Sequence, residues 1–224
     1  MLTAKKSRPF ERLFEFYNRN LFKRRFHSLR IAGLGELTNQ RTPLLIYANH
    51  SAWWDGLVAF EISRQAKLDG FIMMEEKHLK KLFLFRRLGA FSVVRDKPRE
   101  AIKSVDYAAK LLGGNSNKTV WIFPQGEILP SDRRPLRFYN GLARIVERVG
   151  TVRLLPVAIR YEFLSNFKPE IFVKIGKTEE SVEAGKNYNF KNMTAVFAGN
   201  LTVLLDDLRA EIANGNFQNF EKII

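Results

Sequence analysis

The chain has 224 residues, of which 46% are hydrophobic, and 37 Lys and Arg against 23 Asp and Glu give a formal net charge of +14. This length and apolar content predict one folded domain and exclude a disordered chain, and the lack of cysteine excludes a disulfide framework, a thiolate nucleophile and a Cys-based zinc site. The excess of positive charge favours a polyanionic partner, either nucleic acid or the anionic face of a bilayer.

The first predicted element is an amphipathic helix over residues 10–26. Its apolar side chains recur with helical spacing, at Phe10, Leu13, Phe14, Tyr17 and Leu21. Basic residues crowd both ends of the helix, namely Lys5, Lys6, Arg8, Lys23, Arg24, Arg25 and Arg30. This pattern is typical of an interfacial helix on anionic lipid, and equally of a helix that packs on the domain. Both interpretations hold if the helix bridges domain and bilayer.

The membrane interpretation is limited to a peripheral contact. No run of about 18 uninterrupted apolar residues is present, and the N-terminus lacks the compact apolar core of a signal peptide. We therefore expect residues 1–30 to form a membrane-interface region and residues 31–224 to form an α/β domain. The chain is expected to lie on the cytoplasmic face of a membrane.

The body of the chain alternates between predicted strands and helices. Short β-rich runs occupy residues 44–48, 71–74, 91–94, 119–123, 154–161 and 171–175, and helical patterns occupy residues 54–67, 77–87, 99–112 and 140–149. A periodic apolar pattern from Met193 to Ile212 predicts a long helix that covers the sheet. The fold class that follows is α/β, a single domain with a mixed sheet flanked by helices.

The most informative segment directly follows the apolar run 44–48. Asn49-His50-x4-Asp55 places a histidine and an aspartate near the end of a predicted strand, where ligands usually bind in such sheets. A carboxylate that holds one imidazole nitrogen leaves the other free to accept a proton from a hydroxyl. His50 as general base and Asp55 as its partner indicate acyl transfer, with N–H groups at the helix start available for an oxyanion. The alternative is a structural histidine at a strand end.

Three further segments follow in order. Gly89-Ala90-Phe91-Ser92-Val93-Val94-Arg95 places an arginine six residues after a glycine, and Phe123-Pro124-Gln125-Gly126 and Leu155-Pro156-Val157 come later. Together with the His/Asp pair, these segments resemble the four motifs of the glycerolipid (lysophosphatidate) acyltransferase family. The resemblance covers residues 49–157, nearly half of the chain.

The resemblance implies a reaction and a set of site residues. A fatty acyl group would pass from a thioester donor, acyl-CoA or acyl-carrier protein, to the hydroxyl of a membrane-associated acceptor. His50 would be the base, Asp55 its partner, and Arg95 a residue that binds the phosphate of the acceptor. No metal or other cofactor is implied, and the three histidines are too scattered for a His-rich metal cluster.

The third motif departs from the family pattern F-P-E-G-T-R. This chain has Gln125, Gly126, Glu127 and Ile128 after Phe123-Pro124, so the phosphate-binding arginine is replaced by isoleucine and the usual acid by glutamine. Glu127 would also repel a phosphate monoester. We therefore expect an acceptor other than plain lysophosphatidate, namely a neutral or sugar-bearing lipid hydroxyl bound at Gln125, Gly126 and Glu127.

Several alternatives stay open. Arg133, Arg134 or Arg137 could fold back to pair with Glu127 and supply the missing cation, although Phe138-Tyr139-Asn140-Gly141 also lacks the lysine of the family's F-K-x-G. The runner-up function is a catalytically silent, basic protein that binds lipid surfaces. A nucleic-acid binding module ranks lower, because the sequence has no recognition motif for nucleic acid, and we expect no such partner.

Overall fold

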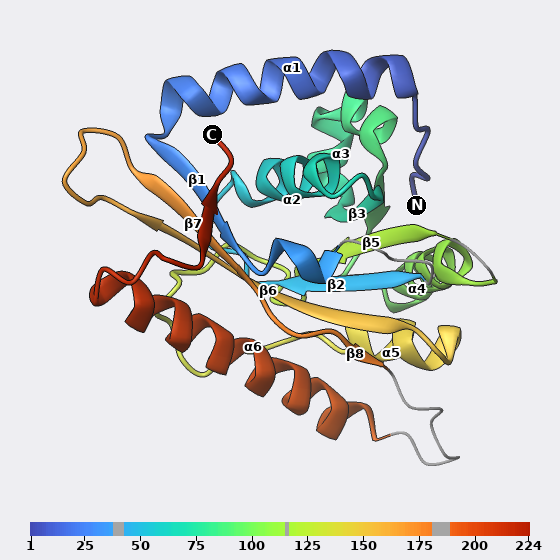
Figure 1. Ribbon diagram of the computed structural model, residues 1–224. Coiled ribbons are helices and arrows are strands. Elements are labelled where there is room, and N and C mark those ends of the chain that lie inside the picture. The colour runs from blue at the N-terminus through green and yellow to red at the C-terminus, as the bar shows by residue number, and fades with distance from the viewer. Residues whose placement is uncertain (38–42, 115–116, 181–188) are drawn as a thin grey trace.

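The structure is a computed structural model that describes residues 1–37, 43–114, 117–180 and 189–224. Within them, one nine-stranded sheet has the order β4-β3-β5-β2-β6-β7-β1-β9, and β8 pairs with β6. The strands are β1 (Ser28–Ala32), β2 (Leu44–Ala48), β3 (Asp69–Glu75), β4 (Ala90–Val93), β5 (Lys118–Ile122), β6 (Arg153–Glu162), β7 (Glu170–Ile175), β8 (Glu179–Glu180) and β9 (Phe220–Lys222). Figure 1 shows this sheet between two layers of helices.

The sheet is mixed. The five strands from β4 to β6 are parallel, β7 runs antiparallel to β6, β1 is parallel to β7, and β9 is antiparallel to β1. The parallel strands are connected through helices, which places helices on both faces. The prediction of a single α/β domain with a mixed sheet is confirmed.

Two helical layers cover the sheet. The helices are α1 (Arg8–Arg25), α2 (Asp55–Gln65), α3 (Glu76–Lys81), α4 (Pro98–Leu112), α5 (Gly141–Val149) and α6 (Phe190–Ala213), with 3-10 turns η1 (Leu34–Leu37) and η2 (Phe83–Leu88). In the central strand β2, Leu45 and Tyr47 pack in the layer of α4, α5 and α6, whereas Leu44, Ile46 and Ala48 pack in the layer of α1 and α2. All five β2 residues are buried, which explains the continuous apolar run in the sequence.

All six predicted strands are present, and each strand end lies within two residues of its predicted position. The helix predicted over residues 77–87 is wrong as one element: α3 ends at Lys81, Leu82 leaves helical geometry, and η2 follows until Gly89 takes a φ of +100°. The short strands β1, β8 and β9 were not predicted. Because β1 begins at Ser28, the sheet already includes the end of the predicted region 1–30.

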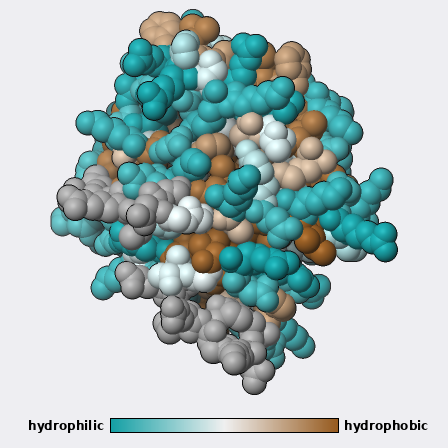
Figure 2. All heavy atoms as spheres, turned by 90° about the vertical axis from the view of Figure 1, so that its right-hand side faces the viewer, coloured by the Kyte–Doolittle hydropathy of each residue, from teal (hydrophilic) through white to brown (hydrophobic). Residues whose placement is uncertain are grey.

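Helix α1 packs on the domain through a face that its apolar pattern did not predict. Glu11 and Asn18, polar residues of the amphipathic pattern, are buried against the domain. Leu13, Phe16 and Tyr17 instead face solvent, with 56% to 70% of each side chain exposed. Figure 2 shows hydrophobic residues along the upper edge of the molecule, at the height where Figure 1 places α1. Among the described residues, none of the helices combines the length and the hydropathy that a membrane span requires.

Polar contacts between α1 and α2 explain this orientation. The carboxylate of Glu61 on α2 is fully buried, and it accepts hydrogen bonds from Asn18 (3.3 Å) and Arg19 (2.9 Å). A second pair, Arg64 with Glu15 at 2.8 Å, is partly exposed. A buried carboxylate must be satisfied by donors, so these contacts fix which side of α1 meets the domain.

Replacing Glu61 tests this attachment. Glu61→Ala should lower the free energy of unfolding by roughly 2–3 kcal/mol, because it leaves the buried amide of Asn18 without its carboxylate acceptor. Glu15→Ala removes the partly exposed pair and should cost less than about 1 kcal/mol. Urea unfolding followed by tryptophan fluorescence measures both values. Equal losses in the two variants would contradict this account of α1.

Candidate active site

The sheet register brings the first and third motifs together. Strands β2 and β5 are parallel neighbours with Tyr47 opposite Ile122, so the residues that follow them meet at the same edge. The backbone N–H of His50 donates to Oε1 of Gln125 at 2.7 Å, and the N–H of Leu129 donates to the carbonyl of His50 at 2.9 Å. The two loops therefore form one unit at the carboxyl ends of the strands.

His50 and Asp55 form a hydrogen-bonded pair. Nδ1 of His50 lies 2.8 Å from Oδ2 of Asp55, and the Asp55 side chain is fully buried, whereas 23% of the His50 side chain is exposed. A carboxylate only accepts hydrogen bonds, so Nδ1 carries the proton and Nε2 has the free lone pair. Among the described residues, no hydrogen bond occupies Nε2.

Both oxygens of the Asp55 carboxylate accept hydrogen bonds. Oδ2 also accepts the backbone N–H groups of Ser51 (2.7 Å) and Ala52 (2.9 Å), and the hydroxyl of Tyr161 donates to Oδ1 at 2.6 Å. Burial, the charge of Asp55 and this hydrogen bond raise the pKa of Tyr161 well above its usual value, so the phenol stays protonated. Tyr161 therefore orients the carboxylate that orients His50.

The surrounding residues fix the position of the imidazole. The ring of Phe123 stacks on the ring of His50 with centroids 4.7 Å apart. The buried side chain of Asn49 bridges to β6, where it accepts from the N–H of Ile159 (2.8 Å) and donates to its carbonyl (2.9 Å). Asn49 thus continues the ladder between β2 and β6 by one residue, directly before His50.

Arg95 and Gly126 lie side by side. Nε of Arg95 lies 2.6 Å from Oε2 of Glu75 at the end of β3, and the guanidinium sits over the ring of Tyr139. Burial alone would lower the pKa of Arg95, but its hydrogen bond and ion pair with Glu75 raise it. A Cβ at Gly126 would come within 2.6 Å of Nη1 of Arg95, and Gly126 has a φ of +72°, so this position requires glycine.

The predicted acceptor residues Gln125 and Glu127 occupy different environments. Gln125 is buried, and its side-chain oxygen is used by the N–H of His50, which favours a role in holding the loop. Glu127 is exposed on the rim and forms no ion pair with any described residue. Water screens its charge, so its repulsion of a phosphate is weaker than the sequence indicated.

The arginines near the third motif do not replace the missing cation through Glu127. Arg134 pairs with Asp206 on α6 at 2.5 Å, and in the described residues neither Arg133 nor Arg137 pairs with Glu127. Arg144 on α5 does reach the site, where its guanidinium packs over Phe190 at 4.9 Å. Arg144 was not predicted as a site residue. Its place three residues after Gly141, just beyond the segment that lacks the family's lysine, was a usable signal.

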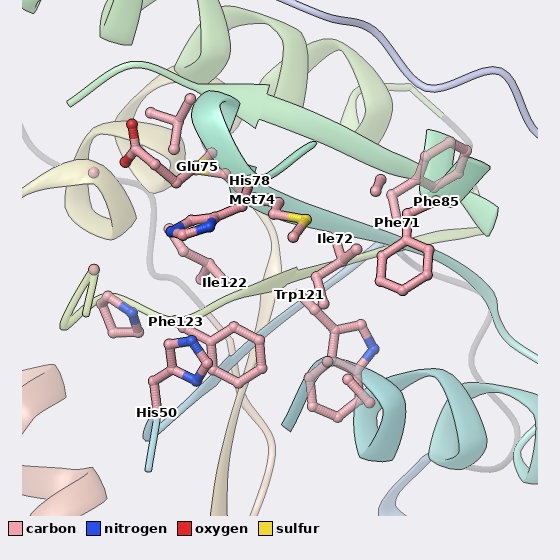
Figure 3. Close-up of a pocket in the computed structure, with 18 of the residues that line it drawn as sticks. His50, Phe71, Ile72, Met74, Glu75, His78, Phe85, Trp121, Ile122 and Phe123 are labelled. Atoms are coloured by element: carbon pink, nitrogen blue, oxygen red, sulfur yellow. The ribbon is translucent and has the colours of Figure 1, made fainter. Parts of the chain in front are cut away.

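One cavity of about 580 Å³ connects these groups with the interior of the α1 and α2 layer. Figure 3 shows His50 and Phe123 at one end and Phe71 and Phe85 at the other. The polar end includes His50, Glu75, His78, Arg95, Glu127 and Arg144, and the remaining wall is mainly apolar, with Phe14, Leu57, Phe60, Ile72, Met74 and Trp121. The structure therefore places the His50/Asp55 pair at the polar end of a long apolar cavity, which a sequence pattern alone does not reveal.

Residues 29–160, more than half of the chain, match the family model named Acyltransferase. The chain belongs to the Acyltransferase family. This confirms the family resemblance predicted from the four motifs. The crystal structure of the 1-acyl-sn-glycerophosphate (LPA) acyltransferase PlsC from Thermotoga maritima has the same fold, with a TM-score of 0.65 and 17% sequence identity over 89% of this chain and 80% of that one. No curated protein matches the chain in sequence.

The contact of Tyr161 with Asp55 can be tested in this acyltransferase. Tyr161→Phe should lower kcat for acyl transfer by about 10- to 100-fold with little change in KM, because partners of this kind orient a catalytic group without touching substrate. Tyr107→Phe is the control, because no hydrogen bond of the Tyr107 hydroxyl is found in the described residues. Steady-state kinetics decide: similar kcat values for both variants would contradict an orienting role.

Proposed function

We propose that the chain is a peripheral membrane O-acyltransferase. It moves a fatty acyl group from acyl-CoA or acyl-carrier protein to a lipid hydroxyl on the cytoplasmic face of a membrane. The observation that carries the proposal is the free Nε2 of His50, oriented by the buried Asp55, at the polar end of an apolar cavity. The same arrangement argues against a catalytically silent lipid-binding protein, because mere binding does not require a fully satisfied His/Asp pair.

The proposed reaction needs one base and one stabiliser of negative charge. Nε2 of His50 accepts the proton of the acceptor hydroxyl while the oxygen attacks the thioester carbonyl; the C–S bond then breaks, and the thiolate leaves. The N–H groups of Ser51 and Ala52 already bind Asp55, so they are not available to the oxyanion. The backbone N–H groups of Glu127 and Ile128 have no acceptor among the described residues and belong to the cavity rim, which makes them the better oxyanion donors.

The apolar part of the cavity suits the fatty acyl chain. Its walls come from α2, β3, η2 and the inner face of α1, with Phe14 among the lining residues. Each methylene of an acyl chain gains about 0.8 kcal/mol when it leaves water for such surroundings. A long acyl chain would therefore bind with its thioester carbon near His50.

The outer face of α1 supports membrane association. Leu13, Phe16 and Tyr17 are exposed there, and the exposed side chains of Arg12 and Arg24 add positive charge. Apolar and basic side chains on one surface match the interface of an anionic bilayer. Since α1 also contributes Phe14 to the cavity, the helix that meets the lipid borders the acyl site as well.

The acceptor is proposed to be a neutral or sugar-bearing lipid hydroxyl. Isoleucine at position 128 removes the cation of the family motif, and the charge of Arg95 is offset by Glu75. The screened charge of Glu127 adds little, so the missing arginine is the stronger argument. Arg144 is the cation that could still receive a phosphate, and the acceptor experiment below distinguishes the two cases.

Removal of the general base is the first test. His50→Ala should lower the release of free thiol from palmitoyl-CoA, in the presence of anionic liposomes and a bacterial lipid extract, by about 100- to 10,000-fold. His27→Ala is the control, because His27 is an exposed residue outside the cavity and the variant should keep wild-type release. If no donor and acceptor give release that depends on His50, the silent lipid-binding protein becomes the better interpretation.

Restoring the family motif tests the acceptor. Glu127→Thr combined with Ile128→Arg should raise kcat/KM for lysophosphatidate by roughly 10- to 100-fold, because a charge-assisted hydrogen bond to phosphate contributes about 1.5–3 kcal/mol. Glu127→Thr with Ile128→Leu is the uncharged control. Wild-type protein that already uses lysophosphatidate efficiently would contradict the proposed acceptor. In that case Arg144→Gln should abolish the activity.

A further inference from the structure

The turn between β6 and β7 carries an unusual concentration of exposed apolar side chains. Phe167 is 99% exposed, the highest value among the large apolar residues that the structure describes, and Phe163 is 74% exposed. Leu164, between them in sequence, is exposed as well. Single exposed apolar residues are common, but three within five residues at the tip of a hairpin indicate a contact surface.

The surroundings of this tip are basic. Residues 163–168 contain no acid, and Nζ of Lys168 donates to the carbonyl of Lys23 in the last turn of α1 at 3.0 Å. Lys23, Arg24 and Arg25 are all exposed there. The hairpin and the basic end of α1 therefore form one surface, and Figure 1 shows the hairpin extending beside the end of α1.

The acids at the base of the hairpin do not cancel this charge. Glu162 pairs with Arg160 at 2.7 Å, and Glu170 pairs with Arg30 at 2.9 Å. Hydrogen bonds from Ser28 and Arg30 lower the pKa of Glu170 despite its burial, so its charge is balanced within the fold. The exposed part of the hairpin thus combines aromatic side chains with uncompensated positive charge, which complements anionic lipid headgroups.

We propose that the tip of the β6–β7 hairpin, residues 163–168, inserts into an anionic bilayer as a second membrane contact beside α1. The proposal rests on the proposed function and extends it. The aromatic side chains of Phe163 and Phe167 enter the interfacial region, while Lys168 and the end of α1 stay at the headgroups.

The second contact has a consequence for the active site. Tyr161, which donates a hydrogen bond to Asp55, lies near the end of β6, two residues before Phe163 in the tip. A helix alone leaves the protein free to roll about the helix axis on the membrane, but a second contact displaced from that axis restricts this motion. The tip therefore sets how the cavity and His50 are presented to lipid in the bilayer.

Vesicle binding tests the tip directly. Phe163→Ser with Phe167→Ser should lower the partition of purified protein onto vesicles of equal parts phosphatidylcholine and phosphatidylglycerol by at least about tenfold. Val196→Ser with Val203→Ser is the matched control: it also removes two exposed apolar side chains, but from α6 on the other side of the sheet, and should bind as the wild type does. Equal binding by the hairpin variant and the control would overturn the proposal.

A fluorescent variant measures insertion itself. Phe167→Trp should gain a tryptophan signal that lipids with brominated acyl chains quench, relative to the wild type. If the signal added by Phe167→Trp is not quenched, the proposal is overturned even if the serine variant binds weakly.

Enzyme activity separates this proposal from the proposed function. In detergent micelles with the bacterial lipid extract, the serine variant should release thiol at the wild-type rate, because the tip contributes nothing to the chemistry. Normal vesicle binding by the serine variant together with His50-dependent thiol release overturns only the hairpin proposal. A wild type that binds no anionic vesicles overturns both the hairpin contact and the membrane part of the proposed function.

Discussion

The buried carboxylate of Asp55 is the constraint on which the rest of the site depends. A charged group without access to water is tolerated only when donors surround it, and Asp55 receives two backbone N–H groups, one imidazole and one phenol. These donors come from the loop after β2 and from β6. The neighbouring positions of β5, β2 and β6 in the sheet are therefore a requirement of the His/Asp pair, because β5 also supplies the segment that holds His50.

A second buried acid has the corresponding role for α1. Glu61 accepts hydrogen bonds from Asn18 and Arg19 and so fixes the face of α1 that meets the domain. Phe16 and Tyr17, on the opposite face, are left in solvent. An amphipathic helix normally buries its apolar face and exposes its polar one. Here specific polar contacts hold part of the polar face inside, and the cost of exposing Phe16 is removed if lipid covers it. The attachment of α1 and the membrane contact proposed for it would thus be two results of one orientation.

The sequence predicted what depends on local pattern. The run 44–48 is apolar throughout because β2 is covered on both faces, so its boundaries were correct, and the four motifs led to the correct family. The contribution of Tyr161 could not be predicted, because it is 106 residues from Asp55 and meets it only through the pairing of β6 with β2. The cavity and the inward face of α1 have the same origin: both depend on which distant side chains pack together, and periodicity carries no information about that.

The change in the third motif is best understood as a redistribution of charge. The family pattern F-P-E-G-T-R has an acid at the position of Gln125, which is buried here and hydrogen-bonded to the backbone of His50. The neutral amide oxygen of Gln125 braces the His50 loop without adding a second negative charge beside Asp55. The acid of the third motif in this chain is instead Glu127, which is exposed to water. Ile128 occupies the position of the arginine in the family pattern. Arg95 is neutralised locally by Glu75, so the polar end of the cavity offers hydrogen bonds and little net positive charge. This balance of charge is the reason for proposing a neutral lipid acceptor, because such an end would distinguish ligands by hydroxyl geometry more than by phosphate charge.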